Sequence, residues 1–236
     1  MKKILLLSTF ISFIFSSYAD NKNTLEKQLL PDVVALSMDS IPAHPKLKYK
    51  LPSALFVAGV GFATVPPFHN IEKSIYTGFN KNPRKQTNVD DYLQYSPAIA
   101  VFALNAIGVK SIYKPKEQLL LYAMSNIGAT LVVQPMKRIV HRERPDKSDF
   151  KSFPSGHTTT AFVAAEFLHQ EYGHLSPWIS IAGYGTAAAT GYLRMRNNVH
   201  WLGDVVAGAA IGIAATKISY WILPKVKKGI KRKNVI

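Results

Sequence analysis

Six apolar stretches, separated by polar segments, follow one another along the chain from residue 51 onwards. They cover residues 51–65, 97–109, 118–133, 158–169, 177–193 and 201–223. The strict alternation of apolar and polar residues that marks a half-buried strand is weak throughout, whereas apolar runs of this length are typical of helices. The pattern therefore predicts an all-α protein.

Small residues are concentrated in the last two apolar stretches. They are Gly183, Gly185, Ala187, Ala188, Ala189 and Gly191 in the fifth, and Gly208, Ala209, Ala210, Gly212, Ala214 and Ala215 in the sixth. Such residues let helices approach closely in lipid, where the hydrophobic effect does not drive helices together. They favour a membrane helical bundle of about five or six transmembrane helices.

The lengths of the stretches support the alternative, a soluble all-α protein with buried helices. A full membrane span needs about 20 apolar residues, and only residues 201–223 reach that length comfortably. The mean hydropathy of +0.03 is also low for a chain made of long spans. If the bundle lies in a membrane, its spans are expected to be short or diluted by polar loops.

The chain divides into four regions. Residues 1–19 combine Lys2 and Lys3 with an apolar core and a small-residue ending, Ser17-Tyr18-Ala19, as in a secretory signal peptide or an N-terminal anchor. Residues 20–50 predict an amphipathic lead-in segment with a short helix near residues 24–38. Residues 51–224 form the predicted helical-bundle domain, and residues 225–236 form a basic C-terminal tail.

The basic tail bears on the orientation in the membrane. Residues 225–233 hold six lysines and arginines, which the positive-inside tendency places in the cytoplasm. If all six stretches crossed the membrane, residues 20–50 would also be cytoplasmic, and that contradicts a cleaved signal peptide. We therefore expect one stretch not to cross. Residues 51–65, which are followed by Pro66 and Pro67, are the candidate.

Charge and cysteine content narrow the classes of function. The formal net charge is +15 and there is no cysteine, so neither a disulfide scaffold nor a thiolate metal site is possible. A strongly basic chain can bind nucleic acid, an anionic membrane surface or an anionic substrate. Because the basic residues are interleaved with apolar runs and the chain begins with an export signal, we expect a membrane and an anionic substrate, and no nucleic acid.

The segment RMRNNVHWLGD, residues 194–204, contains a histidine and a carboxylate four positions apart. On a helix, His200 and Asp204 would share one face. Asp204 could then accept the Nδ1 proton of His200 and leave Nε2 free to act as a nucleophile. Most such pairs are ordinary helix-surface pairs, so the interpretation depends on the neighbouring motifs.

Two other segments supply an anion site. In PSGH, residues 154–157, Ser155 can cap a helix, Gly156 lets the backbone approach a bound group, and His157 stands at the helix start as a proton donor. In KRIVHRERP, residues 137–145, Lys137 and Arg144 are seven apart, which on a helix places them on roughly one side. Together with Arg194 they could surround a phosphate.

The three segments, in this order, resemble the signature motifs of the phosphatidic acid phosphatase type 2 superfamily. They read Lys137-x6-Arg144-Pro145, Pro154-Ser155-Gly156-His157 and Arg194-x5-His200-x3-Asp204. The spacing is met throughout. One position departs, because Leu193 stands where the third motif usually has serine. Arg196 is a rival for the role of Arg194, but only Arg194 has the motif spacing.

The resemblance implies a reaction scheme. His200 would attack phosphorus and form a phosphohistidine, Asp204 would orient His200, and His157 would protonate the leaving oxygen and then activate water. The phosphate oxygens would be bound by five further residues: Lys137, Arg144, Ser155, Gly156 and Arg194. The cationic side chains would supply the positive charge, so no metal and no other cofactor is expected. Among the remaining histidines, His141 is the likeliest to take part.

We therefore expect a phosphatase in the bacterial inner membrane, with its active site facing the periplasm, that hydrolyses a lipid phosphate or lipid diphosphate. Undecaprenyl diphosphate, phosphatidic acid, phosphatidylglycerophosphate and the phosphates of lipid A are all open, and the combination of features resembles the lipid A phosphatase branch. The alternatives are a secreted acid phosphatase of broad specificity, a vanadate-dependent haloperoxidase and a non-catalytic anion-binding membrane protein. Residues 70–91 are expected to form a loop beside the site, whose basic residues either meet a second phosphate or are solvated.

Overall fold

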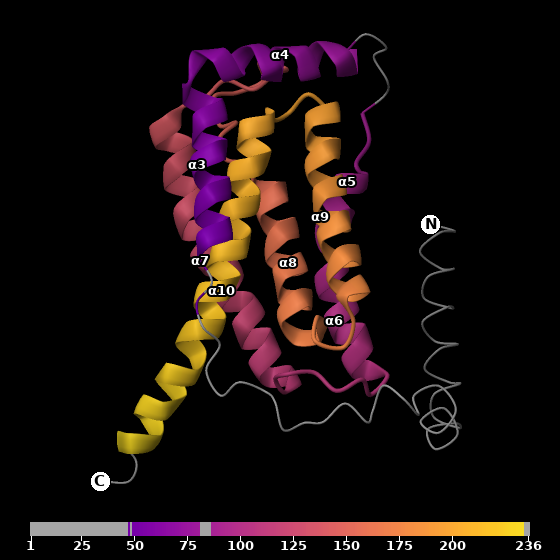
Figure 1. The fold of residues 1–236 in the computed structure, drawn as a ribbon, viewed down its shortest axis with the longest axis vertical. Coiled ribbons are helices and arrows are strands. Elements are labelled where there is room, and N and C mark those ends of the chain that lie inside the picture. Colours follow the sequence, from indigo (N-terminus) through magenta and orange to yellow (C-terminus); the bar gives the residue numbers. More distant parts are fainter. Residues whose placement is uncertain (1–46, 48, 81–85, 234–236) are drawn as a thin grey trace. The chain divides into compact units, whose positions relative to one another are not determined.

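The computed structural model describes residues 47, 49–80 and 86–233, all of which lie in one compact unit, Ala43–Ile236. The predictions for residues 1–19 and for most of the lead-in segment fall outside these residues. Within the described residues the chain is all-helical (Figure 1). The helices are α3 (Lys50–Thr64), α4 (Pro66–Asn80), α5 (Val89–Leu93), α6 (Ser96–Ala106), α7 (Pro115–Val140), α8 (Gly156–Tyr172), α9 (Pro177–Arg196) and α10 (Leu202–Lys233).

Each of the six apolar stretches lies mostly in a helix, which confirms the predicted fold class. The ends of the helices follow local signals. Pro115 and Pro177 occupy the first positions of α7 and α9, where the missing N–H costs nothing. Helix α7 ends where His141 adopts a left-handed conformation with φ of 48°. Helix α10 continues through Pro224 to Lys233, so the described part of the basic tail extends the last helix.

Helix α8 is the central helix of the bundle. It packs against α6, α7, α9 and α10, and the aromatic side chains of Phe167 and Tyr172 on α8 are completely buried. Phe167 packs against Phe102 of α6 and Tyr122 of α7, with ring centroids 5.9 and 5.1 Å apart. The C-terminal half of α8 is therefore held in place by helices on several sides.

Glycines permit close packing of α10 against its neighbours. A Cβ atom added at Gly208 would lie 2.7 Å from the carbonyl oxygen of Ser155, and one added at Gly212 would lie 2.5 Å from that of Thr159. A Cβ atom added at Gly59 of α3 would meet Ala207 in the same way. Gly208 and Gly212, two of the small residues predicted to pack helices together, thus do so, and they bring α10 against the first turn of α8. Gly185 of α9 does not, because it faces open space.

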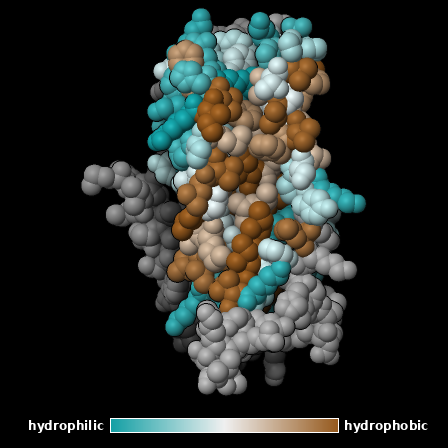
Figure 2. All heavy atoms as spheres, turned by 90° about the vertical axis from the view of Figure 1, so that its left-hand side faces the viewer, coloured by the Kyte–Doolittle hydropathy of each residue, from teal (hydrophilic) through white to brown (hydrophobic). Residues whose placement is uncertain are grey.

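Two described helices are long and apolar enough to cross a membrane, residues Pro115–Val140 and Leu202–Lys227. Helix α3 meets this criterion only together with α4, from which it is bent by 86°. Figure 2 shows a hydrophobic band along one side of the bundle between more hydrophilic ends. The protein is thus a membrane helical bundle, while the number of five or six spans stays a prediction.

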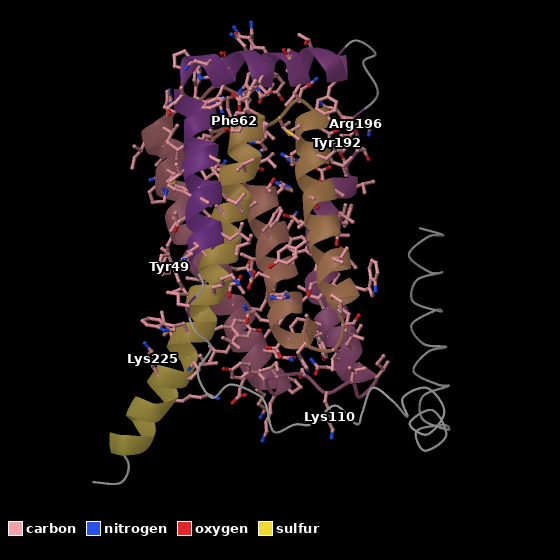
Figure 3. All side chains as sticks on the ribbon, viewed as in Figure 1. Tyr49, Phe62, Lys110, Tyr192, Arg196 and Lys225 are labelled. Carbon is pink, nitrogen blue, oxygen red and sulfur yellow. The ribbon has the colours of Figure 1, made fainter. Side chains whose placement is uncertain are left out.

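The motif residues gather at one end of the bundle. The ends of α7 and α9 and the starts of α8 and α10 lie at one end, which α4 crosses (Figure 1). Phe62 and Arg196 lie towards this end, whereas Lys110 and Lys225 lie towards the opposite one (Figure 3). All the motif residues named above belong to the end that α4 crosses.

Candidate active site

The three motifs, which are spread over 68 residues of sequence, are brought to one end of the bundle. Their eight residues lie in the last turn of α7 (Lys137), the segment that follows it (Arg144), the start of α8 (Ser155, Gly156 and His157), the last turn of α9 (Arg194), the connection to α10 (His200) and the first turn of α10 (Asp204). Arg194 is helical, although it follows the end of the fifth apolar stretch, residues 177–193.

Charge interactions show how closely these residues converge. The charges of Lys137 and Arg144 both act on the ring of His200. The charge of Arg194 acts on Lys137 and on His157. Three cations and two imidazoles therefore share one electrostatic environment. This arrangement can attract and hold a dianionic phosphate between the two histidines.

His200 and Asp204 meet, but not in the predicted way. Helix α10 begins only at Leu202, so the two residues do not share a helix face. The connection turns the ring of His200 towards Asp204, with Nδ1 3.5 Å from Oδ2. The two atoms are not hydrogen-bonded, and Nδ1 has no hydrogen-bond partner among the described residues. Burial lowers the pKa of His200 to about 4, although the charge of Asp204 works in the opposite direction.

Asp204 is completely buried, and several donors hold its carboxylate. Arg142 Nη1 donates to Oδ1 at 2.7 Å, the backbone N–H of Trp201 donates to Oδ2 at 2.8 Å, and the hydroxyl of Ser152 also donates to Oδ2. The sequence analysis did not identify Arg142 or Ser152. Arg142 lies within the first basic segment, but the motif spacing selects other residues in that segment.

The side chains of Lys137 and Arg144 converge for a reason other than the predicted one. Helix α7 stops at Val140, so the two residues do not lie two turns apart on one helix. The chain reverses instead, and Lys137 Nζ donates to the carbonyl oxygen of Lys151 at 2.7 Å. Arg144 Nε donates to Asp149 Oδ1 at 2.7 Å. These contacts fold residues 141–155 over the end of α7.

His141, the expected exception among the other histidines, takes a structural position. Its left-handed backbone ends α7, and its exposed ring stacks on Phe150 with ring centroids 4.8 Å apart. Among the described residues, no hydrogen bond, ion pair or ring contact links it to His157 or His200. His141 therefore shapes the turn that follows α7.

The start of α8 has the predicted cap. The hydroxyl of Ser155 accepts a hydrogen bond from the backbone N–H of Thr158, at 3.5 Å, and one from the Thr158 hydroxyl, at 2.9 Å. The N–H of Ser155 donates to the backbone oxygen of Asp204 at 3.0 Å. Gly156 faces open space, since an added Cβ atom would have no neighbour within 4 Å. The N-terminus of α8 is thus fixed to α10 and open at Gly156.

Two carboxylates of α5 pair with motif residues, and both were missed. Asp90 Oδ2 accepts from Arg194 Nη1 at 2.6 Å, and Asp91 Oδ1 lies 2.9 Å from His157 Nε2. The Nε of Arg194 is buried without a hydrogen-bond partner among the described residues. His157 is about one-third exposed. Burial and the charge of Arg194 lower the pKa of His157, while Asp91 raises it.

The prediction of a loop over residues 70–91 is wrong for most of its described part, because α4 reaches Asn80 and α5 begins at Val89. The signal for α4 was available: Phe68, Ile71, Ile75 and Phe79 recur at helical spacing. The segment does lie beside the site. Of its basic residues, Lys73 is exposed, and the others lie outside the described residues.

Residues 118–228 match the PAP2 superfamily. This region contains all three motifs, so the resemblance drawn from the motifs is confirmed for these residues. A lipid A 1-phosphatase from Porphyromonas gingivalis is 35% identical over 184 residues, which cover 77% of this chain and 39% of that protein. A lipid A 1-phosphatase from Rhizobium johnstonii is 29% identical over 184 residues, with 67% of this chain and 69% of that protein covered.

The chain therefore spans about two-fifths of the length of the first of these relatives. Among solved structures, a transmembrane PAP2 type phosphatidylglycerolphosphate phosphatase from Bacillus subtilis is similar, with a TM-score of 0.50 and 23% identity over 78% of this chain and 96% of that chain. LpxE from Aquifex aeolicus gives a TM-score of 0.47 and 24% identity, over 63% of this chain and 94% of that chain. The B. subtilis structure supports the fold, a membrane helical bundle.

Proposed function

We propose that this chain is a metal-independent membrane phosphatase that removes a phosphate group from a lipid through a phosphohistidine intermediate. One observation carries the proposal: three cations from α7, the following segment and α9 act on two histidines at one end of an apolar bundle. A capped helix start with an open glycine lies at the same place. Such a site suits a tetrahedral anion whose lipid portion lies in the membrane.

The geometry supports a two-step reaction. Asp204 faces Nδ1 of His200, so Nε2 is the nitrogen that attacks phosphorus as the bond to the lipid oxygen breaks. His157 gives its proton to that oxygen. In the second step the neutral His157 removes a proton from water, which attacks the phosphohistidine and releases phosphate and free His200. Lys137, Arg144 and Arg194 stabilise the negative charge in both transition states.

The depressed pKa of His200 fits the role of a nucleophile. Because burial lowers this pKa to about 4, the ring is neutral and its lone pair is available at neutral pH. His157 differs, since it is partly exposed: burial and the charge of Arg194 lower its pKa, and the paired Asp91 opposes that shift. Two histidines in unlike environments can therefore serve as nucleophile and proton donor.

We propose lipid A, at its 1-phosphate, as the substrate. Both curated relatives reported above are named as lipid A 1-phosphatases. A lipid A phosphate is a monoester dianion attached to a large acylated sugar, which suits a site at the end of a lipid-exposed bundle. Phosphatidic acid, phosphatidylglycerophosphate and undecaprenyl diphosphate offer the same phosphate chemistry and are the comparison substrates.

We further propose that the site faces the periplasm of a Gram-negative bacterium. The end opposite the site is basic, with Lys110, Lys114 and Lys116 around the α6–α7 connection and Lys225 and Lys227 on α10. Lysines next to the ends of membrane helices are typical of the cytoplasmic side of a membrane protein. Helix α10, about 48 Å long at 1.5 Å per residue, runs from the site to this basic end.

The test is a phosphate-release assay on the full chain in mixed micelles, with the four lipids in parallel. We expect release from lipid A above the other three, and mass spectrometry of the product should locate the loss at the 1-position. A higher rate of release from another lipid would support the phosphatase proposal but contradict lipid A as the substrate. No release from any of the four would contradict the proposed function.

A further inference from the structure

Glu72 is a buried carboxylate outside the three motifs, on the helix that crosses the site end of the bundle. Its side chain is only 2% exposed. One carboxylate oxygen, Oε2, pairs with Arg142 Nη2. The other, Oε1, accepts a hydrogen bond from the backbone N–H of Gly203 at 2.8 Å. Arg142 contacts Asp204, and Gly203 is the residue before Asp204 in the sequence.

Arg142 connects Glu72 to Asp204. Its two terminal nitrogens go to different carboxylates, Nη2 to Glu72 and Nη1 to Asp204. The guanidinium also lies over the ring of Trp201, 5.6 Å from the ring centroid. Carboxylates of the protein therefore occupy both terminal nitrogens of Arg142. Arg142 holds the carboxylate partner of His200 rather than the substrate.

The contact with Gly203 fixes the start of α10. The first N–H groups of a helix have no partner within the helix, and a carboxylate at this place satisfies one of them and interacts favourably with the helix dipole. The approach requires glycine, since a Cβ atom at Gly203 would lie 2.9 Å from the Gly59 oxygen and 3.1 Å from Glu72 Oε1. Asp204 is the next residue, so Glu72 fixes both its backbone and, through Arg142, its side chain.

The group formed by Glu72, Arg142 and Asp204 contains more negative than positive charges. One guanidinium lies between two buried carboxylates, so Glu72, Arg142 and Asp204 together carry one negative charge. Without Glu72, Arg142 would cancel the charge of Asp204. The nucleophile becomes cationic as its bond to phosphorus forms, and Lys137 and Arg144 oppose that charge. A net negative charge on the Nδ1 side offsets their effect.

We propose that Glu72 is a positioning residue for catalysis. It holds Arg142 against Asp204 and maintains the net negative charge beside His200 that stabilises the transition state. This inference rests on the proposed function. It also connects the reaction to α4, because the carboxylate that completes the group comes from the helix lying across the site. A small cavity between α4 and His200 is lined by Glu72 and Tyr76, which places the helix directly over the nucleophile.

The main test is Glu72→Gln, which keeps the shape of the side chain and its acceptor for Gly203 while removing the charge. The matched control is Glu143→Gln, which removes an exposed carboxylate one residue from Arg142. In full-length protein in mixed micelles with lipid A, we expect kcat to fall about 10- to 100-fold in the first variant. KM should stay within about threefold, since Glu72 does not touch the substrate. The control should match wild type.

A double-variant cycle separates action through Asp204 from a general effect. If Glu72 acts through Asp204, adding Glu72→Gln to Asp204→Asn should cause little further loss. The cycle is also read in the affinity for orthovanadate, which adopts the geometry of a phosphoryl group in transfer. Vanadate should bind more weakly to Glu72→Gln than to wild type by a factor similar to the fall in kcat.

The outcomes distinguish the two proposals. If wild type is active and Glu72→Gln equals the Glu143→Gln control, Glu72 has no positioning role while the proposed function stands. If wild type releases no phosphate from any lipid, the proposed function fails, and the vanadate affinities still test Glu72 by themselves.

If Glu72→Gln does not elute as folded protein, Glu72→Asp keeps the charge but withdraws it by one methylene. An intermediate kcat then supports the proposal, and an unchanged kcat overturns it.

Discussion

His157 Nε2 lies 2.9 Å from Oδ1 of Asp91, a residue 66 positions earlier in the chain. Asp91 belongs to α5, which also supplies Asp90 as the partner of Arg194. Neither carboxylate is part of a signature motif. The short helix α5 therefore contributes one carboxylate to the proposed proton donor and one to a proposed phosphate-binding cation.

The Asp91 contact predicts a change in pH dependence. Asp91 raises the pKa of His157 against the effects of burial and of Arg194, which lower it. In Asp91→Asn the pKa should therefore fall, His157 should lose its proton at lower pH, and the alkaline limb of kcat/KM should move to lower pH. A pH profile in mixed micelles, with Glu143→Gln as an exposed-carboxylate control, measures the shift. An alkaline limb that stays in place would show that Asp91 does not set the protonation of His157.

Replacing the proposed nucleophile gives the simplest prediction. His200→Ala should abolish phosphate release while the protein still elutes as a folded species in detergent. A labelled phosphate group should be trapped on wild type by rapid alkaline quenching and be absent from the variant. His174→Ala changes an exposed histidine in the connection between α8 and α9 and serves as control. Activity near the wild-type level in His200→Ala would remove His200 from this role.

Replacing Gly156 by alanine tests its role in phosphate binding separately from any role in folding. An added Cβ atom would meet no atom within 4 Å, so Gly156→Ala should fold and change stability by no more than about 1 kcal/mol. If a phosphate occupies the open space at this helix start, the methyl group would obstruct it. We expect phosphate release to fall at least about tenfold, with an unchanged thermal midpoint. Full activity would mean that the phosphate lies elsewhere.

The close contact at Gly208 predicts the opposite behaviour. The methyl group of Gly208→Ala would lie 2.7 Å from the backbone oxygen of Ser155, so α8 and α10 would have to move apart at a cost of about 1–3 kcal/mol. Gly185→Ala on α9 introduces the same methyl group into open space and is the control. Thermal unfolding in detergent should show a lower midpoint for Gly208→Ala alone. Equal midpoints would contradict the packing described here.

The helices were largely predictable because each depends on its own sequence. All six apolar stretches lie mostly in helices, and Ser155 caps α8 as its position before an apolar run indicates. The motif residues were also identified, since their spacing is a property of the sequence. The geometry first assigned to two pairs was wrong, because helix ends intervene: α7 stops before Arg144, and α10 starts after His200.

The residues that support the motif side chains could not be predicted in this way. Glu72 pairs with Arg142 across 70 positions, and Arg142 with Asp204 across 62. No local pattern indicates such pairs, because any acidic residue in a polar segment is ordinarily solvated. Only the bend of 86° between α3 and α4, followed by the packing of α4 on the bundle, buries Glu72 beside Arg142.

The sequence by itself determined the helices and the motifs that supply the candidate site residues, since apolar runs and motif spacing are local properties. The tertiary structure decided which charges those residues face. Burial at the bundle end removes water from His200 and Asp204, and only the packed chain supplies the carboxylates and the guanidinium that replace it. The strength of a charge interaction depends on distance and surroundings, and for residues far apart in sequence both are properties of the fold.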